Sequence, residues 1–493
     1  QPLAIREITR YITDHEPPPV DFIAPAASAP MVAVIGGGPC GLGAATFLAR
    51  AGISVTIFEA RPATGGMVSA TIPDYRAATH AVDRDIDYLR ALGVTIRYGQ
   101  EVGQEVSLEM LRAEGFSSIV VAIGARHGLR LGIEGEDSDG VHDGLDFLRA
   151  ARIGEPPALG EKIGVIGGGD VAMDCSRTAC RLSDGEVTVF YRRTRAEMPA
   201  QKEELLDLFD EGGHLEELVA PQRIISTDGR LSAVDMAVMR LGEPDDSGRR
   251  RPEPIAGKER TVELDTLIVA IGQRPDLSLF GGEDVALNDS GYLDVDPQTL
   301  ETSIPGVYAG GDIIGDGPSN IVKACGDGRI IAEAIIARHR QAAAKPKAPE
   351  EWPDFDRYEM LRRRAWIEPR VPIPQTPADQ RNSFAEVVIT LPRNDAEREA
   401  ARCLDCDLIC STCDSVCPNR AILTYRVRPQ EFPVPQFGIV GTQMARLTDV
   451  LFRVDQGPQV AVLTDACNEC GNCVTFCPTS DRPWRDKPRL YLH

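Results

Sequence analysis

The stretch MVAVIGGGPCGLG, residues 31–43, decides the fold of this chain. Its apolar beginning predicts a strand, and Gly36, Gly38 and Gly41 then give the pattern G-x-G-x-x-G at a helix start that includes Pro39. The first glycine permits a tight turn, the second lets the backbone approach a pyrophosphate, and the third lets the helix pack on the strand. The helix N-terminus stabilises the phosphates. The stretch therefore predicts a βαβ unit that binds a dinucleotide.

A carboxylate stands where the ribose of that dinucleotide is expected. The second strand of the unit, Val55–Phe58, is followed directly by Glu59. An acidic residue at this strand end hydrogen-bonds ribose hydroxyls. A lone G-x-G-x-x-G is weak evidence, but the strand, the helix and Glu59 together make a strong prediction.

A second unit of the same kind begins at Lys162. Its strand Ile163–Ile166 leads into Gly-Gly-Gly-Asp-Val-Ala at residues 167–172, where alanine replaces the third glycine. The residues of this turn expected at the nucleotide are Gly167, Gly169, Asp170 and Val171.

Arginines, and no carboxylate, follow the second strand of this unit. They are Arg192, Arg193 and Arg195, after the strand Val187–Tyr191. A carboxylate would repel a ribose 2′-phosphate, whereas arginines pair with it. The pattern predicts NADP(H) over NAD(H), and the alternative is a solvated basic edge.

Two cysteine runs lie near the C-terminus. The second has the form C-x2-C-x2-C-x3-C-P, the ligand run of a bacterial [4Fe–4S] ferredoxin. The first, also ending in Cys-Pro, is one residue longer in its middle. Prolines after the last cysteine and the tight spacing favour iron–sulphur over zinc, the alternative for repeated C-x2-C. We therefore predict two [4Fe–4S] clusters.

The fourth cysteine of each run ligates the other cluster in two-cluster ferredoxins. One predicted ligand set is accordingly Cys467, Cys470, Cys473 and Cys417. The other is Cys477 with Cys406, Cys410 and Cys413, and Cys403 in place of Cys406 is the alternative.

Composition limits the possible functions. A net charge of −21 over 493 residues argues against nucleic acid or an anionic membrane as the main partner. Nine of 13 cysteines lie in the two runs, which fits metal ligation in a reducing compartment rather than disulfides. The sequence shows neither a long apolar run nor a signal peptide, so we expect a cytoplasmic protein. It begins at Gln1, so its true start is expected to lie further upstream.

Residues 31–340 resemble the flavoprotein module of glutamate synthase small subunits and, more broadly, the flavoprotein disulfide reductase superfamily. The resemblance rests on Gly65-Gly-Met67, Ala122–Ala125, Ala270–Pro275 and Pro305–Asp312, beside the two glycine-rich turns. It implies FAD in the first domain, NADP(H) in the second, and hydride transfer that depends on stacking, so no acid–base residue is named. The further residues that it assigns to cofactor contacts are Gly66, Met67, Ala122, Gly124, Gly272, Gly311 and Asp312.

The cysteine region departs from glutamate synthase small subunits, because there it precedes the FAD domain and here it follows. This order is similar to that of iron–sulphur flavoproteins labelled as selenate reductase subunits and of flavoprotein subunits of 2-oxoacid oxidoreductases. The fold class expected is α/β, with two Rossmann-like domains and a small α+β ferredoxin-like domain. The expected segments are an arm and linker at 1–30, an FAD-binding domain at 31–150 and 276–340, an NADP-binding domain at 151–275, a linker at 341–394 and the ferredoxin-like domain at 395–493.

The sequence thus predicts an electron-transfer flavoprotein subunit. It would exchange hydride between NADP(H) and FAD, and single electrons through two clusters with a partner such as a 2-oxoacid or aldehyde oxidoreductase. The alternatives are a stand-alone NADPH:ferredoxin oxidoreductase, a glutamate synthase small subunit and, in another class, a redox-sensing iron–sulphur protein without turnover.

Overall fold

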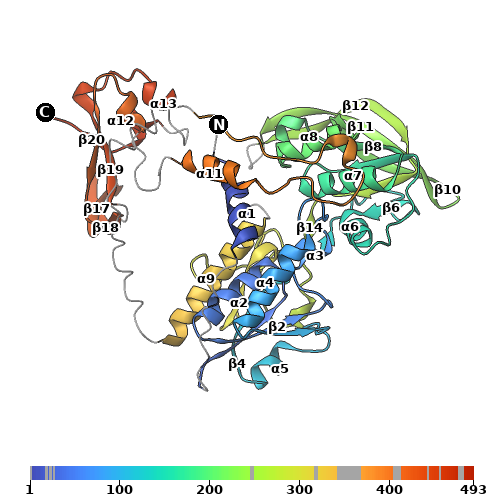
Figure 1. Ribbon diagram of the computed structural model, residues 1–493, viewed down its shortest axis with the longest axis horizontal. Helices are drawn as coiled ribbons and strands as arrows, with labels where there is room; N and C mark the ends of the chain where they lie inside the picture. The colour runs from blue at the N-terminus through green and yellow to red at the C-terminus, as the bar shows by residue number, and fades with distance from the viewer. Residues whose placement is uncertain are drawn as a thin grey trace. The chain divides into compact units, whose positions relative to one another are not determined.

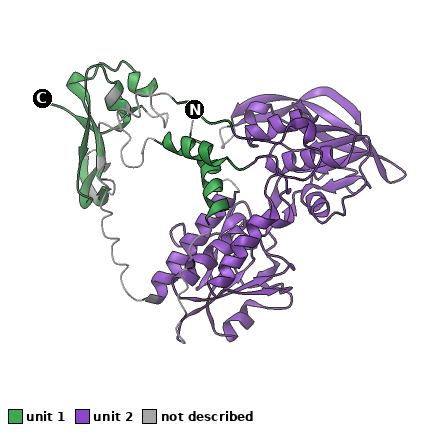
Figure 2. Cartoon of the chain, viewed as in Figure 1, with its two compact units in different colours: residues 1–16, 344–372, 390–493 green, residues 17–343, 373–389 purple. Residues whose placement is uncertain are grey.

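The computed structural model of the chain is shown in Figure 1. It describes residues 3–16, 20, 25, 28–244, 249–315, 320–340, 368–403, 412–440, 443–454, 457–475 and 482–492. The chain forms two compact units (Figure 2). Unit 1 comprises Gln1–Glu16, Ala344–Pro372 and Thr390–His493, and unit 2 comprises Pro17–Ala343 and Ile373–Ile389.

The first sheet of unit 2 is parallel, with the order β15-β4-β1-β2-β3. Its strands other than the edge strand β3 are short, mostly apolar and buried runs, because a parallel sheet is covered on both faces. Their bounds are β1 Met31–Ile35, β2 Ser54–Glu59, β3 Thr95–Tyr98, β4 Phe116–Val121 and β15 Val307–Ala309. The helices of this domain are α2 Pro39–Arg50, α3 Met67–Ala70, α4 Thr79–Ala91, α5 Leu108–Ala113 and α9 Ile321–Arg340.

Helices α2 and α9 approach each other closely through glycine. A Cβ at Gly328 would lie 2.3 Å from the carbonyl oxygen of Cys40, and one at Gly43 would lie 3.1 Å from that of Cys325. This contact holds the start of α2, where the first glycine-rich turn ends, against the chain that returns to the domain after β15.

The second sheet of unit 2 is also parallel, with the order β6-β13-β7-β8-β9. Its strands are β6 Val141–Asp143, β7 Lys162–Ile166, β8 Glu186–Tyr191, β9 His214–Glu217 and β13 Thr266–Val269. Its helices are α6 Gly144–Arg152, α7 Asp170–Leu182 and α8 Lys202–Asp210. The chain passes between the two domains after β4 and again after β13. A short antiparallel pair, β5 His127–Gly128 with β14 Gln273–Arg274, joins these two connecting segments. The predicted α/β class with two Rossmann-like sheets is confirmed.

An antiparallel sheet of β10 Val219–Thr227, β11 Arg230–Pro244 and β12 Arg250–Glu263 is inserted between β9 and β13. The sequence predicts a solvated hairpin or loop at Glu243–Arg260 and a strand-like segment around Thr261–Val269. In the structure β11 and β12 form an antiparallel pair over this stretch, and Thr261–Val269 is divided between β12 and β13. The charge and proline content is accommodated because β12 is an edge strand, where both are tolerated.

Part of the segment expected to be a linker is instead packed into unit 2. Residues 341–367 lie outside the described residues, but the backbone N–H of Val387 donates to the carbonyl oxygen of Tyr75 at 3.0 Å. The side chain of Arg381 is buried and donates to Asp207 at 2.9 Å. We call residues 373–389 the strap. The expectation of a linker was wrong there, because polar residues that look solvated in the sequence satisfy buried partners.

In unit 1, α1 (Ile5–His15) packs on α11 (Arg393–Ala401). Glu399 is fully buried, and its carboxylate accepts the backbone N–H groups of Ala4 at 2.8 Å and Val371 at 2.9 Å. The cysteine-bearing part contains α12 Thr412–Val416, β16 Ile422–Arg426, β17 Gln430–Val440, β18 Gln443–Val454, β19 Pro458–Leu463, α13 Asn472–Thr475, α14 Pro483–Asp486 and β20 Arg489–Leu490. Among the described residues, no helix has both the length and the apolar character needed to cross a membrane.

Candidate functional site

The first glycine-rich turn joins β1 to α2 and leaves no room for a side chain at Gly36 or Gly41. Gly36 has φ +99°, and a Cβ there would lie 2.6 Å from the carbonyl oxygen of Ala122. A Cβ at Gly41 would lie 2.0 Å from the carbonyl oxygen of Gly36. Gly38 is the N-cap of α2 and Pro39 begins the helix. The free N–H groups at this helix start are available to an anion.

Glu59 is held beside this turn. Its Oε2 accepts the backbone N–H of Gly37 at 2.8 Å and its Oε1 accepts that of Arg61 at 2.9 Å. The side chain of Thr64 also lies against Gly37, and its buried hydroxyl has no hydrogen-bond partner within the described ranges. A buried polar group without a partner is uncommon and fits a site that a polar ligand completes.

A second glycine turn lies directly on the first. The N–H of Gly65 donates to the carbonyl oxygen of Gly37 at 2.7 Å, and Gly66 has φ +58°. A Cβ at Gly66 would lie 2.8 Å from the Cα of Gly38. Met67 begins α3 immediately afterwards. The two turns therefore form a backbone cradle that fits the pyrophosphate and ribose of FAD.

The stretch Pro305–Asp312, which contains β15, belongs to the same first domain. Gly311 has φ +76°, and its N–H donates to the buried carboxylate of Asp327 at 2.9 Å. The ammonium of Lys323 contacts the same carboxylate oxygen at 2.9 Å. Gly124 follows β4 with φ +68°, a conformation that favours glycine. These backbone positions match those that the resemblance assigns to cofactor contacts.

A cavity of about 800 Å³ opens between the two dinucleotide domains of unit 2. The second glycine-rich turn, Gly167–Val171, lines one part of it, Gly272 lines the crossover, and Gly311 and Asp312 line the part that belongs to the first domain. Gly167 has φ +149°, and a Cβ there would lie 2.2 Å from the carbonyl oxygen of Ala270. The volume suits a dinucleotide-sized ligand, and one cavity thus joins residues that the sequence assigned to two different cofactors.

The three predicted arginines have different surroundings. Arg192 and Arg193 line the cavity. The guanidinium of Arg195 instead donates to Glu217 at 2.7 Å. Burial opposes ionisation of Glu217, but hydrogen bonds from the side chain and backbone of Arg195 outweigh it and lower the pKa of the carboxyl.

Arg249 also lines the cavity, and sequence reasoning missed it. It lies in the charged stretch that was expected to be a solvated hairpin or loop. The run Arg249–Arg251 was the available signal, but only the pairing of β11 with β12 brings it back to the nucleotide domain.

Four predicted cluster ligands border one pocket in unit 1. They are Cys417, Cys467, Cys470 and Cys473, beside Trp484. Burial raises the pKa of the Cys473 thiol, and the charges of Cys467 and Cys417 raise it further, as expected for neighbouring sulphurs. The Sγ of Cys417 accepts the N–H of Ala421 at 3.3 Å.

The donor set of this pocket, four cysteine sulphurs, is of the kind that holds a [4Fe–4S] cluster. Within the described part of the chain, no group of three or more Cys, His, Asp or Glu side chains is placed so that it could hold a metal ion. Of the second ligand set, Cys406, Cys410 and Cys477 lie outside the described residues. Cys413 is buried near the same pocket, and Cys403 is exposed.

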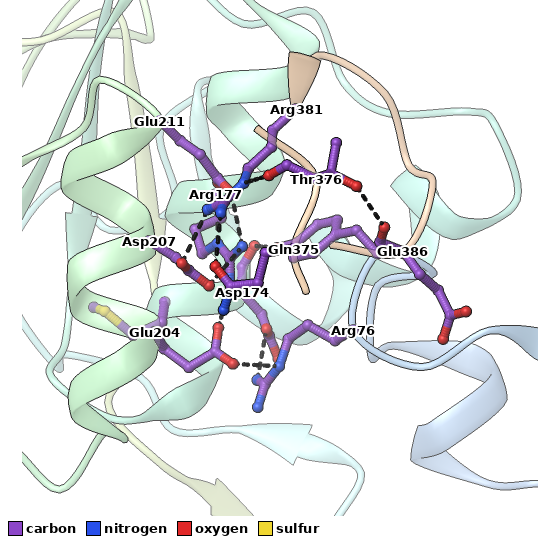
Figure 3. A network of polar contacts seen from close by, with 12 residues as sticks. Arg76, Asp174, Arg177, Glu204, Asp207, Glu211, Gln375, Thr376, Arg381 and Glu386 are labelled. Carbon is purple, nitrogen blue, oxygen red and sulfur yellow. Dashed lines mark hydrogen bonds and ion pairs between the residues drawn. The ribbon is translucent and has the colours of Figure 1, made fainter. Parts of the chain in front are cut away.

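A buried charge network connects the two dinucleotide domains and the strap (Figure 3). Arg177 of α7 is 1% exposed and is surrounded by the carboxylates of Glu204, Asp207 and Glu211. Arg76, from the first domain, donates to Asp174 of α7 at 2.8 Å. Sequence patterns gave no sign of this network.

Comparison with known proteins shows several similar oxidoreductases. The chain is 39% identical over 378 residues, 71% of its length, to NADP(+)-dependent formate dehydrogenase subunit beta of Moorella thermoacetica, of which it covers 53%. It is 35% identical over 93% of its length to the oxidoreductase YgfK of Escherichia coli K12, of which it covers 40%. The chain therefore spans about half the length of these relatives.

Glutamate synthase [NADPH] small chain of Escherichia coli K12 is 34% identical over 62% of this chain and 68% of its own length. Among solved structures, FprA of Mycobacterium tuberculosis in complex with NADPH has a TM-score of 0.56 at 18% identity, over 64% of this chain and 85% of its own. That likeness shows the fold. The family model of pyridine nucleotide-disulphide oxidoreductases matches residues 30–217 and 225–328. The resemblance noted in the sequence is confirmed, and the chain belongs to the pyridine nucleotide-disulphide oxidoreductase family.

Proposed function

We propose that this chain is an electron-transfer flavoprotein. It exchanges hydride between NADP(H) and FAD, and passes single electrons through two [4Fe–4S] clusters to or from a partner oxidoreductase subunit. The observation that carries the proposal is the shared cavity, because Gly167–Val171 of one domain and Gly311 and Asp312 of the other line it together. A pyridine nucleotide bound at Gly167–Val171 would therefore face a flavin bound at Gly311 and Asp312.

FAD would occupy the cradle of the first domain, residues 31–150 with 276–340. The turns at Gly36–Gly41 and Gly65–Met67 would hold its pyrophosphate, and Glu59 its ribose. The backbone at Ala122–Gly124 and the side chain of Asp312 would lie along the rest of the molecule. FAD would supply the hydride chemistry and the change from electron pairs to single electrons, while the chain positions and encloses it.

NADP(H) would bind in the second domain, residues 151–275. The turn at Gly167–Val171 would hold its pyrophosphate at the start of α7. Arg192 and Arg193, which follow β8 and line the cavity, would favour the 2′-phosphate, since guanidinium groups bind phosphate in pairs of hydrogen bonds. Gly272 lines the cavity where the chain crosses between the two domains, and a Cβ there would lie 2.9 Å from the side chain of Leu129.

The clusters would take their ligands from the two cysteine runs, as the sequence predicts. The pocket bordered by Cys417, Cys467, Cys470 and Cys473 supports the first ligand set, in which Cys417 comes from the other run. The similarity to YgfK extends over 93% of the chain, a length that reaches into the cysteine-bearing region. We retain Cys406, Cys410, Cys413 and Cys477 for the second cluster.

A separate subunit is proposed to carry the substrate chemistry. Two relatives are named as beta subunits, of an NADP(+)-dependent formate dehydrogenase and of an NADPH-Fe(3+) oxidoreductase. These names support a partner subunit that exchanges electrons with this chain, and the 2-oxoacid or aldehyde oxidoreductase expected from the sequence stays a proposal.

An anaerobic titration with NADPH tests the proposal. Flavin absorbance and the EPR signals of reduced clusters are followed together, on protein with about eight irons and eight sulfides per chain. Flavin bleaching followed by cluster signals supports one electron path through both units. Bleaching without cluster signals would mean that electrons normally flow toward NADP⁺, and photoreduction of the clusters followed by addition of NADP⁺ then tests that direction. Stoichiometric zinc in place of iron would overturn the cluster assignment.

A further inference from the structure

Arg249 is a cavity-lining arginine that lies far from the glycine-rich turn in sequence. It immediately precedes β12, and residues 245–248 between it and β11 lie outside the described residues. It lines the same cavity as Arg192 and Arg193, which follow β8. The end of β8 is where a Rossmann domain reads the ribose 2′ position of its nucleotide. The inserted antiparallel sheet thus adds an arginine to the wall of the cavity that the residues after β8 also line.

The backbone around Arg249 is fixed to this place by its neighbours. The Nε of Arg193 donates to the carbonyl oxygen of Arg250 at 2.7 Å. The guanidinium of Arg250 in turn donates to the carbonyl oxygens of Leu241 at 2.9 Å and Gly242 at 3.1 Å. The side chain of Arg193 is buried, so this arginine anchors the start of β12 to the end of β8. The start of β12, next to Arg249, is therefore held beside the residues after β8 and beside the end of β11.

Arg195 has a different role in the same region. The carboxylate of Glu217 accepts its backbone N–H at 2.8 Å and its Nε at 2.7 Å. The guanidinium is thereby drawn to the end of β9, and Arg195 is absent from the cavity wall among the described residues. Two of its donor groups serve one carboxylate, so using it for a phosphate would first require that pair to break.

We propose that Arg249 is a specificity-determining residue that binds the 2′-phosphate of the nucleotide together with Arg192, in the place that the sequence assigned to Arg195. The proposal rests on the proposed function, since it needs NADP(H) in the cavity. Two guanidinium groups from different strands would hold the phosphate between them, as charge-assisted hydrogen bonds to phosphate are shorter and stronger than neutral ones.

The test compares Arg249→Gln with Arg195→Gln and Arg251→Gln in the holoenzyme, using a viologen acceptor. Arg251 is exposed, adjacent in sequence, and outside the cavity wall, so its variant is the matched control. Arg249→Gln should lower kcat/KM for NADPH by about tenfold or more, because one charged hydrogen-bond partner is lost. The loss should appear in KM, with kcat retained and kcat/KM for NADH changed by less than about twofold. The Arg251→Gln and Arg195→Gln enzymes should keep the wild-type ratio of NADPH to NADH efficiency.

A binding measurement provides a readout besides activity. The wild-type protein should bind 2′,5′-ADP more tightly than 5′-AMP. In Arg249→Gln the ratio of the two affinities should fall by about tenfold, and Arg249→Lys should recover part of it. An equal loss for both nucleotides, or a loss in Arg195→Gln but not in Arg249→Gln, would overturn the inference and leave NADP(H) use intact. A wild-type preference for NADH would instead overturn the proposed function at this site.

Discussion

Arg177 and Glu211 form a two-point ion pair inside the second domain of unit 2. The Nε of Arg177 donates to one carboxylate oxygen at 3.0 Å and its Nη2 donates to the other at 2.7 Å. Their side chains are 1% and 3% exposed. Glu211 also accepts two hydrogen bonds from Arg181. This carboxylate therefore balances two buried guanidinium groups on α7 and fixes that helix against the end of α8.

Removal of this carboxylate should strongly destabilise the protein. In Glu211→Gln two buried arginines lose their shared charge partner, and breaking such a pair from one side costs about 3–5 kcal/mol. We expect a clearly lower unfolding temperature, followed by circular dichroism at a fixed heating rate. Glu397→Gln removes half of the exposed pair Arg393–Glu397 on α11 and should leave the temperature unchanged, since such surface pairs contribute little. Equal effects of both variants would contradict the role given to Glu211.

The stability of the protein should depend on pH through Asp174. Burial raises the pKa of this carboxyl to about 7, although Arg76 acts in the opposite direction and Glu204 reinforces the rise. The folded state therefore binds a proton that the unfolded state releases near pH 4, so stability falls as pH rises from about 4 to about 7. Above pH 7 the full penalty for ionisation is present.

Asp174→Asn isolates that contribution, because all other titrating groups are shared with the wild type. The unfolding temperature of Asp174→Asn minus that of the wild type should increase as the pH is raised from 4.5 to 7.5. The attraction of Arg76 acts only on the ionised carboxylate, so it is already contained in this pKa and makes the slope smaller without reversing it. A difference that stays constant with pH would show that Asp174 titrates in its normal range.

Gly36→Ala should abolish flavin binding. The added Cβ would lie 2.6 Å from the carbonyl oxygen of Ala122 at a residue with φ +99°, so β4 and the turn could not keep their places. The purified variant should lack the flavin absorption bands. Gly326→Ala is the control, because it lies in α9 with no atom within 4 Å of the new Cβ. That variant should retain its flavin, and a colourless Gly326→Ala protein would mean that any disturbance of the domain releases the cofactor.

The sequence predicted the parts of this molecule that depend on local chain geometry. Gly36, Gly41 and Glu59 follow from one βαβ unit, because strand, turn and helix leave a fixed spacing. Contacts between distant segments leave no such pattern. Arg381 meets Asp207 at a separation of 174 residues, and in the sequence both look like ordinary surface charges.

The arginines show the same limit within a single site. Arg192 and Arg193 could be assigned from their position after β8, as neighbours of a recognised motif. Arg195 shares that position, yet Glu217 on the next strand draws its guanidinium away. Arg249 reaches the cavity only through the pairing of β11 with β12, and in a charged, proline-containing stretch the sequence gives little indication of strands.

Cys473→Ser should remove one cluster and leave the flavin reaction intact. Cys473 is buried at the pocket that Cys417, Cys467 and Cys470 also border, so its sulphur is proposed to ligate the first cluster. The variant should retain about four of eight irons and still be bleached by NADPH at the wild-type rate, since its substitution is remote in sequence from both glycine-rich turns. Cys403→Ser is the matched comparison, because Cys403 is exposed and is proposed to be spare. This variant should keep all of its iron. If Cys403→Ser loses iron and Cys406→Ser does not, Cys403 is the ligand in the first cysteine run and Cys406 is not.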